Sequence, residues 1–262
     1  MASLDKFNSK ERFSDRVDNY KKYRPTYPDS LLDFLQAKCG LTSDATVADI
    51  GSGTGILTEL LLKKGWTVYA IEPNAKMRES AEAQLNDYPN FSSLDGSGEA
   101  TGLPDQSVQL ITVAQAFHWI DPVLARKEFD RILLPGGHIA LLWNLRTLDS
   151  PFDKGYEDIK AKYGTDYHEI RKAHEPELTA FFAPATMAIH YFRHSQQLDF
   201  EGLKGQVLSS SYMPQPGQKN YEEMMKALTE LFEVNQRYGE VTITYDTKLY
   251  INHNTSMKEG IH

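Results

Sequence analysis

The chain has 262 residues, of which 40% are hydrophobic and 24% are charged, so its composition is that of a globular protein rather than a disordered or fibrous one. It holds 28 Lys and Arg and 36 Asp and Glu, and the resulting formal net charge of −8 disfavours binding to phosphate backbones and anionic membranes. The single cysteine, Cys39, excludes an internal disulfide framework and a multi-cysteine zinc site.

No apolar run approaches the roughly 18 residues of a membrane span, and the first residues lack the apolar core of a secretory signal. The histidines show no metal-ligand spacing with a supporting acid, so we expect no metal. We therefore expect a soluble cytoplasmic protein, a monomer or a homodimer, with no nucleic-acid or membrane partner.

Residues 1–30 form a polar segment in which apolar side chains recur at helical spacing until prolines interrupt the pattern. A short helix is predicted over residues 31–39 and is ended by Gly40. From Thr46 onward, strands and helices alternate. The predicted strands cover residues 46–50, 66–72, 91–96, 108–115 and 138–144, and the predicted helices cover residues 56–65, 74–87 and 121–137, the last one ended by glycine.

Beyond Arg146 the alternation fades. Residues 150–180 are polar and predicted to be helical, residues 186–200 and 241–251 are predicted strands, and residues 201–236 form a helical insertion between them. Strands alternating with helices predict a parallel sheet covered on both faces. The two late strands lack a crossover helix, which favours an antiparallel hairpin at one edge. The expected fold is therefore α/β, with a doubly wound, mostly parallel, seven-stranded sheet.

The most specific motif is Asp49-Ile50-Gly51-Ser52-Gly53-Thr54-Gly55, which lies where a buried strand turns into a helix. Glycines let the backbone approach a ligand, and the following helix offers unpaired N–H groups. A dinucleotide fingerprint would need a third glycine where Ile56 stands, and a P-loop would need a lysine that this loop lacks. Both phosphate-binding interpretations therefore fail.

Two carboxylates accompany this loop. Asp49 precedes the first glycine by two positions and would repel a diphosphate but attract an ammonium or sulfonium group. Glu72 ends the second predicted strand, where an acid can accept hydrogen bonds from both hydroxyls of a ribose. A ligand with a ribose, a positive charge and no phosphate is S-adenosylmethionine.

Several segments carry a family resemblance. VADIGSGTG, YAIEPN, GEATGLPDQSVQLITVAQAFHWID and RILLPGGHIALLWN resemble the successive motifs of the class I S-adenosylmethionine-dependent methyltransferases, which have a Rossmann-like fold. Within them the chain is similar to the methyltransferase type 11 small-molecule group, which includes fungal trans-aconitate methyltransferase-like proteins. YKKYRPTYP, AQAFHW and YDTKLY carry that finer likeness. The resemblance spans most of the chain and is strongest over residues 13–146.

The resemblance implies S-adenosylmethionine as cofactor and assigns residues to its parts. The methionine end is expected at Asp49, Gly51, Ser52 and Gly53. The ribose is expected at Glu72, with Pro73, Asn74 and Met77 near ribose or adenine. The adenine edge is expected at Ser97 and Gly98, the sulfonium at Gln115 and Ala116, and a lid over the cofactor at Tyr20 and Arg24. Relatives often carry Asp where Gln109 stands and Ala where Gly98 stands, and the second departure weakens the adenine assignment.

The resemblance also suggests how the chain is organised. We expect one methyltransferase domain over residues 1–262, with an N-terminal lid over 1–30 and a cofactor-binding core over 31–146. Residues 147–236 would supply substrate-side helices, the sixth strand and the insertion, and residues 237–262 the last strand and tail.

Methyl transfer from a sulfonium is an in-line displacement that needs a general base only when the acceptor must lose a proton. His118, near the carboxyl end of the fourth predicted strand, is the candidate base, since its ordinary pKa of ~6.5 suits proton removal near neutrality. A role as a pocket wall is the alternative. Arg24 and Arg146 are candidates for binding an acidic acceptor.

The expected function is therefore methyl transfer to a small-molecule acceptor, such as a carboxylate or another oxygen nucleophile. A cofactor-binding protein without catalysis is one alternative. A nucleic-acid methyltransferase is another, although Cys39 is poorly placed as a nucleophile and AQAFHW stands where amino-methylating enzymes carry Asn/Asp-Pro-Pro-Tyr. A nicotinamide oxidoreductase is disfavoured by Asp49 and Ile56.

Overall fold

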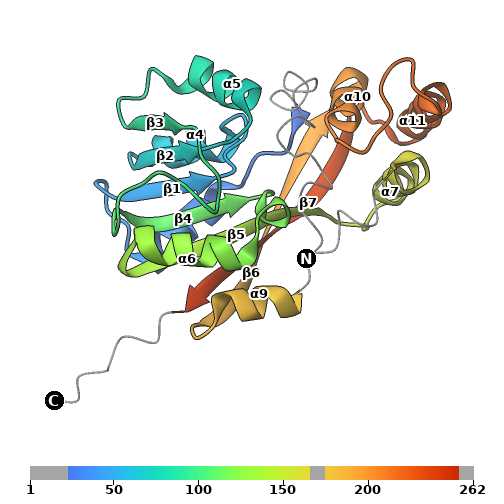
Figure 1. Cartoon of the computed structure of the whole chain (residues 1–262). Helices are drawn as coiled ribbons and strands as arrows, with labels where there is room; N and C mark the ends of the chain where they lie inside the picture. The colour runs from blue at the N-terminus through green and yellow to red at the C-terminus, as the bar shows by residue number, and fades with distance from the viewer. Residues whose placement is uncertain (1–22, 166–174, 254–262) are drawn as a thin grey trace.

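The computed structural model describes residues 23–165 and 175–253, and the predicted lid residue Tyr20 lies outside these ranges. A seven-stranded sheet, ordered β3-β2-β1-β4-β5-β7-β6, forms the centre of the molecule (Figure 1). Its strands are β1 (Thr46–Ile50), β2 (Thr67–Ile71), β3 (Phe91–Leu94), β4 (Val108–Ala114), β5 (Leu133–Arg146), β6 (Thr186–Leu198) and β7 (Val241–His253).

The first five strands pair in parallel, whereas β7 runs antiparallel between β5 and β6. This topology confirms the predicted α/β doubly wound sheet with an antiparallel hairpin at one edge. The helices are α3 (Asp29–Cys39), α4 (Ile56–Lys63), α5 (Ala75–Leu85), η2 (Phe117–Trp119), α6 (Pro122–Ile132), α7 (Pro151–Tyr163), α9 (Glu175–Phe182), α10 (Phe200–Leu208) and α11 (Tyr221–Asn235).

Helices cover both faces of the parallel part of the sheet. Leu31 and Leu35 of α3 and Leu61 of α4 are fully buried in one apolar cluster, against Val47 of β1. On the opposite face, α6 and α9 pack against β4 and β5 in a second cluster. The continuous apolar runs of the parallel strands follow from this double coverage, because side chains on both faces are buried.

The predicted boundary between the third helix of the alternating region and the fifth strand is wrong. The helix was expected to reach Gly137, but α6 ends at Ile132, and Leu133 has the extended backbone of a strand (φ −78°, ψ 134°). Leu133 pairs with Val108 at the start of β5, and the register shifts before the next pair. Pro135 explains the difference, because a proline disfavours helical backbone in the residue before it.

The hairpin of β6 and β7 extends beyond the parallel strands, and α7, α10 and α11 gather around its far end (Figure 1). These helices and the hairpin share a third apolar cluster, in which Tyr156, Leu203 and Leu228 are fully buried against Ile243. The predicted insertion over residues 201–236 is therefore present as α10 and α11, joined by a segment that contributes Met213 to the same cluster.

Candidate functional site

The glycine-rich loop connects β1 to α4 and lies next to the loop after β4. Gly51 has a φ of 64°, a left-handed conformation that favours glycine. A Cβ atom on Gly51 would lie 2.5 Å from the Cβ atom of Ala116, so the two loops are in van der Waals contact there. Gly53 and Gly55 also have positive φ angles, of 59° and 86°. The sequence therefore needs glycine here for both conformation and close approach.

Asp49, which is 1% exposed, is held between three elements. Its Oδ2 accepts a hydrogen bond from the Thr58 hydroxyl at 2.7 Å, and its Oδ1 accepts one from the Thr112 hydroxyl at 2.9 Å. Burial raises the pKa of Asp49 to about 6, although the two hydroxyls oppose the rise. The carboxylate is thus fixed in orientation and desolvated, so it acts strongly on a nearby positive charge.

Glu72 connects the end of β2 to the glycine loop. Its Oε2 accepts a hydrogen bond from the Gly53 N–H at 2.9 Å, and its Oε1 accepts one from the Asn74 N–H at 2.8 Å. Burial raises the pKa of Glu72 in spite of these bonds. Each carboxylate oxygen keeps a further lone pair, so two hydroxyl donors of a ligand can still bind.

An open cavity lies at the carboxyl end of β1 and β4. Six of the residues that line it were expected at the site: Arg24, Asp49, Gly51, Ser52, Gly53 and Gln115. The other lining residues are Pro25, Tyr27, Thr54, Ile56, Leu57, Ala114 and Asn144, and sequence reasoning gave no role at the site to Thr54 and Leu57. Thr54 Oγ1 is buried and makes no hydrogen bond to another described residue, which leaves it available to a ligand.

The remaining predicted residues lie beside the cavity rather than in its lining. Asn74 caps α5, with its Oδ1 accepting a hydrogen bond from the Met77 N–H at 3.1 Å. The Met77 sulfur would lie 3.8 Å from a Cβ atom on Gly53, so Met77 adjoins the glycine loop. Pro73 directly follows Glu72 in the chain and precedes Asn74. None of the predicted ribose residues lines the cavity, but Glu72 and Met77 adjoin it through Gly53.

Ser97 and Gly98 belong to a short turn behind the loop that follows β4. A Cβ atom on Gly98 would lie 2.9 Å from the Ile120 side chain. An alanine at this position would crowd Ile120, so glycine suits the close approach of the two loops here. Gln109, the other departure, accepts a hydrogen bond from the Thr46 N–H at 2.5 Å and joins β4 to the start of β1.

His118 lies in η2, close to the carboxyl edge of the sheet. Its side chain is exposed, its ring centroid is 4.6 Å from that of Trp119, and it is not among the residues that line the cavity. Gln115, three residues earlier, has a φ of 58° and does line the cavity. Positive φ in a residue other than glycine costs conformational energy and is common at functional sites.

Asn144 of β5 connects the chain segment around Thr26 to the sheet. Its Nδ2 donates a hydrogen bond to the carbonyl of Thr26 at 3.0 Å, and its Oδ1 accepts one from Thr247 at 2.5 Å. Arg24 donates a hydrogen bond to the carbonyl of Ser209 at 3.1 Å. The described part of the predicted lid is thereby attached to β5 and to the end of α10.

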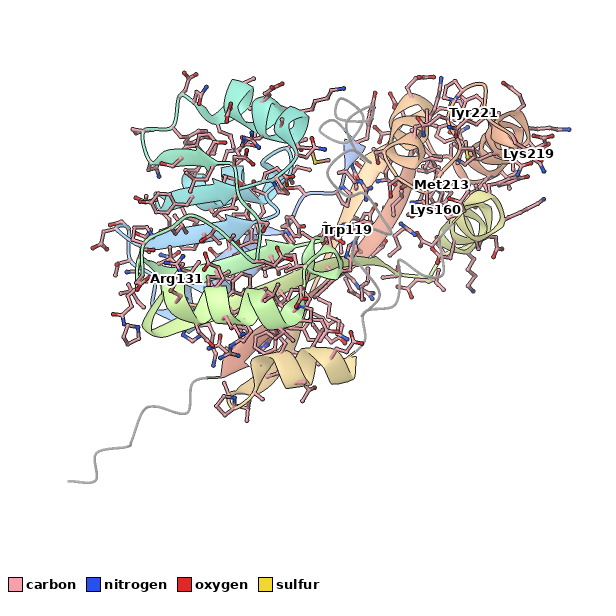
Figure 2. The ribbon with its side chains drawn as sticks, viewed as in Figure 1. Trp119, Arg131, Lys160, Met213, Lys219 and Tyr221 are labelled. Carbon is pink, nitrogen blue, oxygen red and sulfur yellow. The ribbon has the colours of Figure 1, made fainter. Side chains whose placement is uncertain are left out.

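A polar cluster that the sequence did not predict lies between α7 and the segment after α10. Lys160 of α7 is 2% exposed and donates hydrogen bonds to Ser210 at 3.2 Å and to the Tyr212 hydroxyl at 3.3 Å. Figure 2 shows Lys160 and Met213 near each other on α7 and the segment after α10. A sequence signal did exist, because Phe152, Tyr156 and Lys160 recur every four residues on the buried face of a helix.

Comparison with known proteins places the chain in a family. A family model described as a methyltransferase domain matches residues 48–141. An uncharacterized methyltransferase of Schizosaccharomyces pombe is 30% identical over 227 residues, which are 86% of this chain and 88% of that relative. An uncharacterized methyltransferase of Mycobacterium tuberculosis is 39% identical over 134 residues, which are 51% of this chain and 52% of that relative. The match thus spans about half the length of the mycobacterial protein.

Solved structures agree on the fold. A proposed type II methyltransferase from Anaeromyxobacter dehalogenans superimposes with a TM-score of 0.66 and 19% identity, covering 87% of this chain and 97% of that one. An S-adenosylmethionine-dependent methyltransferase from Aquifex aeolicus has a TM-score of 0.53 and 17% identity, covering 91% of this chain and 97% of that one. At these identities, the likeness concerns the fold alone.

The chain belongs to the class I S-adenosylmethionine-dependent methyltransferases. S-adenosylmethionine is the cofactor of this family, and the residues present fit it. A Cβ atom on Gly51 would collide with Ala116 in the loop after β4. The buried carboxylate of Glu72 accepts a hydrogen bond from the Gly53 N–H in the glycine loop, and that of Asp49 accepts one from Thr58 in the following helix. The likeness to trans-aconitate methyltransferases stays a prediction, since these matches do not single out that group.

Among residues 23–165 and 175–253, no helix is long and apolar enough to cross a membrane. Within the same ranges, no three His, Cys, Asp or Glu side chains lie close enough together to hold a metal ion.

Proposed function

We propose that this chain transfers a methyl group from S-adenosylmethionine to an oxygen atom of a small-molecule acceptor. The observation that carries the proposal is the pair of buried acids, Asp49 and Glu72, at the ends of adjacent parallel strands around a glycine-rich loop. Such a site attracts a cation and accepts hydrogen bonds from a ribose, and it disfavours the phosphates of a dinucleotide.

The residues of the chain would then divide the work of binding. Glu72 would accept hydrogen bonds from the ribose hydroxyls, and Asp49 would stabilise the positive charge of the methionine part. The Arg24 guanidinium and the Thr54 hydroxyl would bind the methionine carboxylate, since both residues line the cavity. Gln115 and Ala116 would border the sulfonium, and Ser97 and Gly98 the adenine edge.

When bound, the cofactor supplies an activated methyl group that an acceptor oxygen takes in one in-line displacement. The protein then has to orient the acceptor and exclude water. A carboxylate acceptor needs no base, whereas a hydroxyl acceptor does. We propose His118 as that base, because it follows β4 at the carboxyl edge, where open α/β sheets bind their ligands. Residues 147–236 would select the acceptor.

The direct test uses the full-length protein and S-adenosylmethionine with an isotopically labelled methyl group. The acceptors are a panel of small carboxylates and hydroxyl compounds, with DNA and RNA as separate arms. We expect label in a small molecule and none in nucleic acid. Cofactor binding without a labelled product would favour a non-catalytic binding protein, and binding of NAD in place of S-adenosylhomocysteine would overturn the proposal.

The His118→Ala variant tests the base. For a hydroxyl acceptor we expect a fall in kcat of about 100-fold, in the range that general bases contribute, with an unchanged Kd for S-adenosylhomocysteine. An unchanged kcat with a hydroxyl acceptor would mean that His118 is a surface residue near the site and not the general base.

A further inference from the structure

A polar cluster between the end of β5, α7 and the segment after α10 contains a buried ammonium group, that of Lys160. We call it the cationic cluster: Arg24, Arg146, Lys160 and Tyr212. Arg146 ends β5 and pairs with Glu157 at 2.9 Å. Lys160 lies over the rings of Tyr156 and Tyr212, at 5.1 and 5.5 Å from their centroids.

The ammonium group of Lys160 is buried without a carboxylate partner among the described residues. Its hydrogen bonds go to two hydroxyls, those of Ser210 and Tyr212. Of the carboxylates of α7, Glu157 pairs with Arg146, Asp153 caps the start of the helix at Ser150, and Asp158 is exposed. Burying a charge without an opposite charge is costly, and proteins usually avoid it.

The pKa values of Lys160 and Tyr212 reflect the positive charges that lie near them. Burial, with the charge of Arg146 acting in the same direction, lowers the pKa of Lys160 to about 8. Burial alone would raise the pKa of Tyr212, but the charges of Lys160, Arg146 and Arg24 outweigh it and bring the pKa to about 7. The local field therefore favours a negative charge at the Tyr212 hydroxyl.

The cationic cluster adjoins the cofactor cavity. Asn144, which lines the cavity, and Arg146 lie two residues apart on β5 and so share one face of the sheet, about 7 Å apart. Arg24 belongs to both sites, since it lines the cavity and donates a hydrogen bond to Ser209 beside the cluster.

We propose that the cationic cluster binds an anionic oxygen group of the methyl acceptor, a carboxylate or a phosphate, through Lys160 and Arg146. This inference rests on the proposed function and adds the chemical class of the acceptor. The bound group holds the acceptor and is not the oxygen that is methylated. Oxygens whose lone pairs accept hydrogen bonds from two cations are poor nucleophiles, so a second oxygen of the acceptor receives the methyl group.

According to this proposal, the buried charge of Lys160 lowers the stability of the folded protein but binds the anionic group of the acceptor. Replacing a buried, unpaired charge by an apolar side chain of similar length is often neutral or stabilising. We therefore expect Lys160→Met to have an unchanged or higher Tm without ligands and yet to lose binding of the anion. A purely structural lysine would give the opposite pattern, a lower Tm and unchanged binding.

The test is isothermal titration calorimetry of the full chain, saturated with S-adenosylhomocysteine, against named probes. The anions are 4-hydroxybenzoate, succinate and inorganic phosphate, and the neutral analogues are 4-hydroxybenzamide and succinamide. We expect at least one anion to bind wild-type protein about tenfold or more tightly than its neutral analogue, the value of a charged hydrogen bond. The relative strength of succinate and phosphate distinguishes a carboxylate from a phosphate site.

Lys160→Met should weaken binding of that anion about tenfold and change binding of the amide less than twofold. The matched control is Lys162→Met, because Lys162 lies on the same helix but is exposed. It should behave as wild type. Equal binding of anions and amides by wild-type protein, or no binding of either, would overturn the anion site while S-adenosylhomocysteine still binds. Failure of S-adenosylhomocysteine itself to bind would overturn the proposed function instead.

Discussion

The cofactor side and the acceptor side of this molecule are built from opposite charges and in different ways. On the cofactor side, two buried carboxylates, Asp49 and Glu72, are held by hydroxyls and backbone N–H groups from segments within about 65 residues of each other. On the acceptor side, Arg24, Arg146 and Lys160 are brought together by the lid, β5 and α7. The cofactor side is thus built by a local motif, and the proposed acceptor side by tertiary packing.

The largest effect is expected at the contact between the two loops of the cofactor side. Gly51→Val introduces a β-branched side chain at a φ of 64°, with its Cβ atom 2.5 Å from that of Ala116. We expect S-adenosylhomocysteine binding to become undetectable by calorimetry and the free energy of unfolding to fall by about 3 kcal/mol, as in severe overpacking.

Gly65→Ala is the matched control for Gly51→Val. Gly65 has a φ of 87° but open space around its Cα atom. It should lose only about 1 kcal/mol of stability, from backbone strain, and keep normal cofactor affinity. Equal losses of binding in the two variants would mean that the contact between the loops is unimportant.

Glu72→Ala should weaken S-adenosylhomocysteine binding by about 1–3 kcal/mol, roughly tenfold to a hundredfold, because it removes the charged acceptor that we propose for the ribose. It also releases the Gly53 N–H and so loosens the glycine loop. Calorimetry measures the change, with Glu79→Ala on the exposed side of α5 as control. An unchanged Kd would remove Glu72 from the ribose site.

Asp49→Asn should make the protein more stable at pH 7 and weaken its binding of the cofactor. The pKa of Asp49 is raised from 3.8 to about 6, so the native state holds its proton more tightly than the unfolded state. The wild type therefore loses about 2–3 kcal/mol of stability as pH rises from about 4 to 6. Asparagine carries no such charge, and the variant should lack this loss.

Denaturant unfolding of both proteins between pH 4 and pH 7 measures the difference. The advantage of Asp49→Asn should be present at pH 7 and vanish near pH 4, where Asp49 is protonated in both states. Parallel pH dependences in the two proteins would contradict the assigned pKa.

The same contrast explains how much of the cofactor side and of the acceptor side could be predicted from the sequence. The glycine loop, Asp49 and Glu72 could be predicted because a strand–loop–helix pattern fixes their relative positions within a short stretch. The meeting of Lys160 with Tyr212 could not, since it depends on how α7 packs against a segment 52 residues away. The boundary at Leu133 was missed because its apolar side chain fits both the helix and the strand pattern.

The smallest effect is expected from Thr54→Val, which separates ligand binding from folding on the cofactor side. Thr54 Oγ1 is buried and makes no hydrogen bond within the described residues, so replacing it by a methyl group should change stability by less than about 0.5 kcal/mol. Its loss should weaken S-adenosylhomocysteine about threefold to tenfold, if its hydroxyl binds the methionine carboxylate as proposed.

Thr112→Val provides the matched contrast, because the Thr112 hydroxyl donates to Asp49 at 2.9 Å. It should cost about 1 kcal/mol of stability and raise the pKa of Asp49 further, since a hydrogen bond to the charged form is lost. Thermal unfolding and calorimetry on the two variants then give opposite patterns. A stability loss in Thr54→Val equal to that in Thr112→Val would mean that Thr54 serves the fold rather than the cofactor.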